Sequence, residues 1–184
     1  MSVCLDIEHS YLHDLDITLT CPDGTSIDLY FAYIGSLNAV HLGEPVDNDN
    51  SLTYGNPLNY CFTNTATERW YDVAEPVIPP PLGTIPEHSY TDNDGTAVNN
   101  AYYIPAGDYL PDESFAGLEG CPLNGDWTIT ITDNLSQDNG TMFSWSIDFA
   151  PDLYTTTYDY TPPIIDTVWV PEPTITVDYG TTIE

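Results

Sequence analysis

The sequence has no lysine and only one arginine, Arg69, against 29 acidic residues, which gives a formal net charge of −28 over 184 residues. Proteins bind DNA and RNA largely through cationic side chains that displace counterions from the phosphates. This chain has almost no such side chains, and its charge would also repel an anionic membrane surface. We therefore expect no nucleic-acid partner. Divalent cations and salt-rich water suit so acidic a surface, although the charge also serves solubility alone by keeping copies apart.

The sequence also lacks long apolar runs, and none approaches the roughly 20 residues that a membrane-spanning helix needs. We therefore expect no membrane insertion. The first residues, MSVCLDI, show neither the basic start nor the apolar segment of a secretory signal peptide. If the protein is exported, we expect this chain to be a piece of a longer polypeptide.

Cysteine is scarce and widely spaced, without any C-x-x-C pair. The four cysteines are Cys4, Cys21, Cys61 and Cys121. This spacing argues against a zinc site or thioredoxin-like chemistry and favours two disulfides in an exported protein, for which three pairings are possible. Cys4 lies between the apolar Val3 and Leu5 and so faces away from them. Cys21 is in phase with the apolar Leu19 instead, and a bond between Cys4 and Cys21 across a hairpin is disfavoured because opposed residues must share a face.

Helix signals are almost absent, and apolar residues instead alternate with polar ones, as in half-buried strands. Alternating segments occupy residues 3–7, 15–20, 26–31, 126–133 and 143–149. In the last segment Phe143, Trp145 and Ile147 share one face, so we expect them to point inward, together with Trp127 of the preceding segment. The pattern predicts an all-β protein, a β-sandwich of the jelly-roll or immunoglobulin-like kind.

The remainder of the chain is less regular. Residues 36–107 are rich in Asn, Asp, Gly and Pro and predict long loops with short strands. We expect one domain over residues 1–150, followed over 151–184 by a Tyr-, Thr- and Pro-rich linker or extension with one further strand near 174–179. A lone strand cannot bury itself. It would join the sandwich, begin a next domain, or add to the sheet edge of another copy and so build a fibre.

Two long stretches of the sequence carry the ordered motifs of one known family. The first, DIEHSYLHDLDITLTCPDGTSIDL, has an I-x-H-(T/S)-(Y/W) motif from Ile7, followed by D-L-x-I-x-L-x-(S/C)-P-x-G-T from Asp14. The second, GCPLNGDWTITITDNLSQDNGTMFSWSIDF, has an N-G-x-W strand from Asn124 and an S-W-S strand that ends at Phe149. Together they resemble the P domain, or P/Homo B domain, of proprotein convertases, in the version found in large surface proteins of Bacteroidetes-type bacteria. The resemblance covers about residues 3–149 and is looser in the middle.

That resemblance implies a jelly-roll β-sandwich with no catalytic machinery of its own. Such domains stand among other modules in bacterial surface proteins, and in convertases they pack beside a subtilisin-like protease domain and stabilise it. We expect a non-catalytic structural or adhesive module at the bacterial cell surface, whose partners are other domains or copies of the same protein. Two alternatives stay open: an accessory domain of a subtilisin-like protease, and a carbohydrate-binding module that contacts surface glycans.

Three carboxylates stand where the resemblance implies acids near calcium: Asp14, Asp133 and Asp138. Calcium takes about six to eight oxygen ligands from carboxylates, amides, backbone carbonyls and water. If the strand that starts at Asp14 and the strand that ends at Asp133 meet at the same end of the sandwich, the three side chains converge. The alternative is that each is a solvated loop acid that caps a turn.

Two loops form a second tier of calcium candidates: VDNDN, with Asp47 and Asp49, and TDNDG, with Asp92 and Asp94. Both begin like D-x-D calcium loops. Neither completes an EF-hand, because the twelfth position counted from Asp92 is Tyr103, where a glutamate is needed. A plain turn is the alternative for each loop.

Other chemistry has weaker support in the sequence. His9 and His13 have a spacing that brings two imidazoles together only on a helix, whereas here they flank a turn between strands. The resemblance implies a structural role for His9. No serine lies in a nucleophile motif and no carboxylate pair stands out, so we expect no enzyme activity. Trp70 and Trp169 fall outside the alternating strands and are the candidates for stacking on sugars.

Overall fold

The computed structural model describes residues 1–31, 39–46, 48, 50–75, 85–135 and 138–150, which belong to one compact unit, Met1–Ala150. Asp47, Asp49, Trp169 and the predicted strand near 174–179 lie outside the described residues. In the part of the chain that is described, no helix combines the length and the apolar character needed to cross a bilayer.

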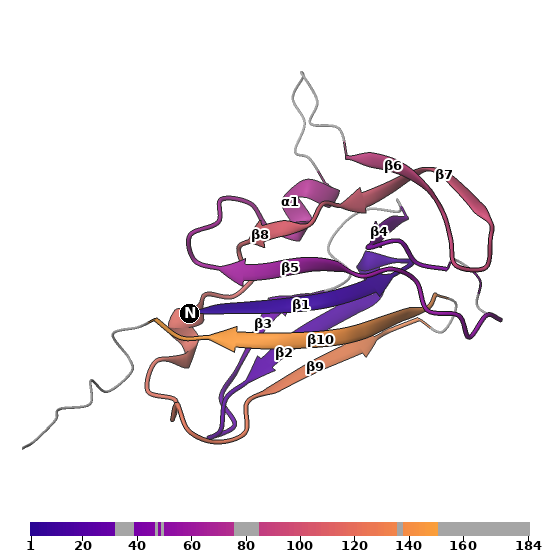
Figure 1. The fold of residues 1–184 in the computed structure, drawn as a ribbon. Helices are drawn as coiled ribbons and strands as arrows, with labels where there is room; N and C mark the ends of the chain where they lie inside the picture. The colour runs from indigo at the N-terminus through magenta and orange to yellow at the C-terminus, as the bar shows by residue number, and fades with distance from the viewer. Residues whose placement is uncertain (32–38, 47, 49, 76–84, 136–137, 151–184) are drawn as a thin grey trace, which may run out of the picture. The chain divides into compact units, whose positions relative to one another are not determined.

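Strands make up most of the regular structure, so the all-β prediction is confirmed (Figure 1). The strands are β1 (Ser2–His9), β2 (Leu15–Thr20), β3 (Ser26–Tyr30), β4 (Val40–Leu42), β5 (Leu58–Thr63), β6 (Glu87–Thr91), β7 (Ala97–Ile104), β8 (Gly107–Tyr109), β9 (Thr128–Asp133) and β10 (Gly140–Asp148). The described residues also form three short helices: η1 (Leu12–Asp14), α1 (Trp70–Ala74) and η2 (Phe115–Leu118). Short strands were expected between residues 36 and 107, and β4 and β8 fit that expectation, but β7 is eight residues long.

Two sheets form a β-sandwich-like arrangement. The larger sheet has the order β6-β7-β4-β1-β5-β8, with β10 also paired to β1, and the smaller sheet has the order β3-β2-β9. The pairs β4–β7 and β5–β8 are parallel, and the others are antiparallel. Figure 1 shows β1 and β10 side by side in one layer and β2 and β9 in the other. The jelly-roll connectivity that the resemblance implies stays a prediction.

The core lies between the two sheets. Side chains alternate between the two faces of a strand, so every second residue of β1 and β2 points inward. These inward-facing residues are buried: Val3, Leu5 and Ile7 of β1, and Leu15, Ile17 and Leu19 of β2. Trp127 and Trp145, expected inside the sandwich, pack against this core but are only partly buried. They therefore lie at its margin and not at its centre.

Trp70, which we expected to be free for stacking on sugars, is one of the largest core side chains, with 1% of its surface exposed. The centroids of four aromatic rings lie 4.9–6.3 Å from its own, those of Tyr30, Tyr60, Phe62 and Tyr109. The expectation was wrong because this segment is helical. The Asp72 carboxylate accepts a hydrogen bond from the Arg69 N–H at 2.9 Å, which starts α1 at Trp70 and turns the indole inward.

Strand β10 departs from the predicted alternation. Its register with β1 pairs Leu5 with Trp145 but Ile7 with Met142, so β10 accommodates one extra residue between these pairs. Phe143, which we expected to point inward, is 44% exposed as a result. Met142 takes the place in line with Ile7 that the alternation assigned to Phe143.

Two disulfides, Cys4–Cys61 and Cys21–Cys121, join residues 57 and 100 positions apart in the sequence. Cys4 lies directly opposite Cys61, on the face of β1 and β5 that points away from the core. The parity argument against a bond between Cys4 and Cys21 is therefore confirmed.

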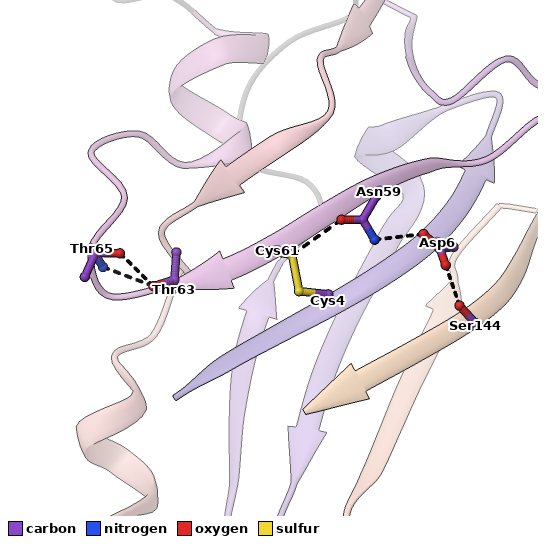
Figure 2. Close-up of a disulfide and its surroundings, with 7 residues drawn as sticks. All are labelled: Cys4, Asp6, Asn59, Cys61, Thr63, Thr65 and Ser144. Carbon is purple, nitrogen blue, oxygen red and sulfur yellow. Dashed lines mark hydrogen bonds between the residues drawn. A yellow bond between two sulfur atoms is a disulfide. The ribbon is translucent and has the colours of Figure 1, made fainter. Parts of the chain in front are cut away.

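A row of polar contacts crosses the same outer face beside the Cys4–Cys61 bond (Figure 2). Ser144 of β10 and Asn59 of β5 both donate hydrogen bonds to the Asp6 carboxylate of β1. These two bonds lower the pKa of Asp6, because they stabilise its charged form. Three neighbouring strands are thus tied together by side chains as well as by their backbones.

Candidate functional site

One end of the sandwich gathers the acids that the sequence analysis singled out. Asp133, the last residue of β9, pairs with Leu15 at the start of β2, directly after Asp14. Asp138 lies just before β10, whose first residue pairs with the last residue of β1. The antiparallel pairing therefore places Asp14, Asp133 and Asp138 at the same end. That they bind a metal stays a prediction.

Hydrogen bonds hold the loops together around Asp14. Asn134 donates twice to the Asp14 carbonyl, from its backbone N–H at 2.9 Å and from its side-chain amide at 3.0 Å. Ser10 and Asn139 form a reciprocal pair: the Ser10 N–H donates to the Asn139 carbonyl at 2.9 Å, and the Asn139 N–H donates to the Ser10 hydroxyl at 3.1 Å. The backbone thus fixes the positions from which Asp14 and Asp138 project.

Asp14 is the most perturbed acid of this cluster, because only 1% of its surface is exposed. Burial, a hydrogen bond with Asp138 and the negative charges of Asp138 and Asp133 raise the pKa of Asp14 to about 6. Two side-chain oxygens of the cluster, Asp14 Oδ2 and Asn139 Oδ1, are buried and have no hydrogen-bond partner. A buried oxygen without a donor is destabilising, and such oxygens are the expected ligands of a cation.

His9 closes the cluster on the side of β1. Its Nε2 lies 3.7 Å from Asp133 Oδ2, but burial lowers its pKa despite the opposing pull of that carboxylate. Gly140 is required beside it, because a Cβ there would lie 2.2 Å from Cδ2 of the His9 ring. His13 has a different partner, since its Nδ1 lies 3.4 Å from the Tyr30 hydroxyl. The two histidines of the H-x-x-x-H pattern therefore do not act as a pair.

The donor atoms around Asp14 are oxygens, the type of ligand that a hard cation such as calcium prefers. Asp14, Asp133 and Asp138 supply carboxylate oxygens and Asn139 an amide oxygen, which are ligands that calcium prefers. The Asp133 side chain is 37% exposed, so it has room to rotate toward Asp14 without disturbing the core.

The tightest group of metal-ligand atoms lies elsewhere and is not a metal site. Among the described residues, only Cys21, Asp23 and Cys121 bring three ligand atoms of His, Cys, Asp or Glu within 4.8 Å of one another. The two sulfurs are joined in a disulfide, so they are not available as thiolates. The carboxylates of Asp14, Asp133 and Asp138 do not all lie within that distance of one another. A calcium ion held by all three would therefore draw them closer together.

The TDNDG loop is a turn held by its own aspartate. Asp92 Oδ1 accepts hydrogen bonds from the backbone N–H groups of Asp94, at 3.0 Å, and Thr96, at 2.7 Å, between β6 and β7. The hydroxyls of Ser51 and Thr53 lower the pKa of Asp94 by hydrogen bonding. The loop thus has the hydrogen bonds of a plain turn, and calcium binding by Asp92 and Asp94 stays a prediction.

Sequence reasoning named the acids of the cluster but missed the residues that position them, Ser10, Asn134 and Asn139. Their roles depend on the shapes of three loops, which the alternation pattern does not reveal. One signal was present: each directly follows a residue that the sequence analysis had singled out.

No protein-family model, no curated protein and no solved structure matches this chain. The resemblance to the P domain therefore rests on the sequence motifs and stays a prediction.

Proposed function

We propose that this chain is a non-catalytic β-sandwich module of an exported bacterial surface protein, with a structural or adhesive role, and that calcium stabilises the end of the sandwich around Asp14. One observation carries the cation site. The Asp14 carboxyl group is buried beside Asp138, and one of its oxygens has no partner.

Two neighbouring carboxylates, one of them buried, are stable only if a proton or a positive charge offsets their repulsion. The chain has no lysine, and its single arginine, Arg69, lines a different groove. His9 lies beside Asp133, but burial lowers its pKa and favours the neutral imidazole. A divalent cation supplies the missing charge and accepts the oxygen ligands that the cluster offers.

Export is supported by the disulfides and by the resemblance. Disulfides persist in oxidising compartments and are rare in the cytosol. Both bonds, Cys4–Cys61 and Cys21–Cys121, use every cysteine of the chain. The P-domain motifs are the reason to place the module on a bacterial surface.

A structural role is supported by the groove around Arg69, which has a volume of about 420 Å³. Two of its carboxylates accept backbone hydrogen bonds from β3 and from the residue after it: Glu113 accepts the Asp28 N–H and Asp112 accepts the Phe31 N–H, each at 2.9 Å. Such contacts fasten one segment to another. The carbohydrate-binding alternative, in turn, loses its described candidate, because the side chain of Trp70 is part of the core.

Thermal unfolding of the full chain, in calcium chloride and in chelator, tests the cation site. Calcium in large excess over its dissociation constant should raise the midpoint by about 5–10 °C. Asp14→Asn and Asp138→Asn should each remove most of that rise. Asp126→Asn, which changes the same charge at an exposed loop position, should keep it.

Sodium chloride at matched ionic strength controls for simple screening of the acidic surface. Equal midpoints in calcium and in sodium chloride would remove the cation from the proposal. A full calcium response in both cluster variants would place the binding site somewhere else in the chain.

A further inference from the structure

Two strands of the sandwich have a free edge on the same side. Within the described residues, β10 pairs only with β1, and β9 pairs only with β2. The two strands belong to different sheets and follow each other along the chain, as Figure 1 shows. Their free edges flank one opening between the sheets.

An apolar cleft of about 320 Å³ lies in this opening. Aliphatic and thioether side chains from both sheets line it, those of Ile7, Leu15, Ile129, Ile131 and Met142. His9 and Asp133 also line it and make one part polar. Inward-facing residues of β9 and β10 are only partly buried, whereas those of β1 and β2 are fully buried. The core is therefore closed in its middle and open along this side.

Proteins protect exposed edges with lysine, proline, inward-pointing charges or β-bulges. The edge of β9 has none of these features, and the edge of β10 has only the β-bulge between Met142 and Trp145. β9, TITITD, has a charged residue only at its last position, and β10, GTMFSWSID, likewise only at its last. The edge of β9 thus remains suited to backbone pairing along its length, and the edge of β10 on either side of its bulge.

The chain also contains a segment whose pattern suits this opening. Residues 174–179, TITVDY, alternate Ile175, Val177 and Tyr179 with polar residues, and their first three letters repeat the start of β9. A strand with this alternation presents three apolar side chains on one face. Such a face matches a cleft lined by aliphatic side chains.

We propose that residues 174–179 of one copy add as a strand at the β9–β10 opening of a second copy. The free backbone edge supplies hydrogen bonds, and the apolar face of the added strand fills the cleft. Because donor and acceptor are different surfaces, the contact is heterologous and continues from copy to copy, into a fibre wherever it does not close into a ring. This pairing rests on the proposed structural role of the module but not on its cation site.

The intervening segment favours a second copy over the same molecule. Residues 151–173 separate Ala150 from the donor strand, and five of these 23 residues are proline. A proline-rich linker at roughly 3.1 Å per residue spans about 70 Å when extended. A strand meant for the edge of its own β10 would need only a short turn, as most connections do.

Sedimentation velocity of the full chain, in calcium and moderate salt over a wide range of concentration, tests the pairing. Ile175→Asp/Val177→Asp charges the apolar face of the donor, and Thr174→Asp/Thr176→Asp adds the same charge to the opposite face. The unaltered chain and the threonine variant should form dimers and longer species as concentration rises, while the apolar-face variant stays monomeric. Asp14→Asn should still associate, so the two proposals can fail separately.

The acceptor surface is tested on the apolar-face variant, which keeps its own opening. A synthetic peptide of residues 171–184 should bind it and slow amide hydrogen exchange in β9 and β10. An unaltered chain that stays monomeric, or an apolar-face variant that associates equally, would overturn the proposal. If the unaltered chain is monomeric and amide exchange in its β9 and β10 is slower than in the apolar-face variant, the donor strand pairs within its own molecule. That result would also overturn the proposal.

Discussion

Asp14 shows how one buried carboxyl group links the stability of this chain to pH. Its pKa is raised from 3.8 to about 6, so the folded chain holds this proton more tightly than the unfolded chain does. Without metal, the stabilisation from the protonated group is complete below the unfolded value and is lost as the pH rises through about 6. His9 acts in the opposite sense, because its lowered pKa makes protonation destabilising as the pH falls below its usual 6.5.

In chelator, the unfolding midpoint of the unaltered chain should fall relative to that of Asp14→Asn between about pH 5 and about pH 7, by about 3 °C or more. The reason is that only the unaltered chain must ionise a buried acid. Differential scanning calorimetry at several pH values measures this difference, and the acids and histidines outside the cluster cancel in the comparison. Midpoints that change in parallel would contradict the raised pKa.

At this scale the sequence predicted the positions of the acids better than the groups that hold them. The motif spacing placed Asp14 and Asp133 at strand ends and Asp138 in the loop that follows, and the strand pairing brings these positions to the same end of the sandwich. Asn134 and Asn139 were not predicted, because an amide side chain gains its partner only when a loop takes a particular shape.

Among the elements, the hairpin of β6 and β7 depends on the aspartate in its turn. Asp92→Ala leaves two backbone N–H groups without an acceptor and should lower the free energy of unfolding by about 1–2 kcal/mol. Urea denaturation measures the loss, with Asp126→Ala as the exposed control. The calcium-induced rise in midpoint should be unchanged. Its disappearance in Asp92→Ala would instead move the cation site to the TDNDG loop.

Strands with unbroken alternation were predictable, and those with an irregularity were not. The pattern identified β1, β2 and β9 because each keeps one apolar face. It misplaced Phe143, because a β-bulge shifts the faces without changing the composition of the strand. It also missed α1, whose start depends on Asp72 and the burial of Trp70 more than on helix propensity.

For the whole molecule, the two disulfides should differ in importance. The Cys4–Cys61 bond joins β1 and β5, which six residue pairs already hold in register. The Cys21–Cys121 bond instead fastens the mostly exposed segment around Cys121. In the chain-entropy model either bond contributes about 4 kcal/mol. In this model the bond acts on the unfolded chain, and its contribution grows with the length of the closed loop, so Cys21→Ala/Cys121→Ala should cost slightly more than Cys4→Ala/Cys61→Ala. Urea unfolding of both variants measures the difference, and a clearly larger loss in Cys4→Ala/Cys61→Ala would contradict the chain-entropy account.

The overall architecture was predictable only in part. Alternation, turn residues and the absence of helix signals indicated two layers of strands around one core, and that is what forms. The order of the strands was not predictable. The parallel pairs β4–β7 and β5–β8 join segments that lie far apart in the sequence, and no local sequence pattern indicates such pairs.

The start of α1 also affects how easily trypsin-like proteases cleave this chain. Trypsin-like proteases cut after lysine or arginine, and Arg69 is the only such residue in the sequence. The bond they would cut joins Arg69 to Trp70, whose indole is locked among four aromatic rings at the first turn of a helix. Cleavage there requires local opening of the helix and withdrawal of the indole from the core. The folded chain should therefore resist trypsin far longer than the unfolded chain does.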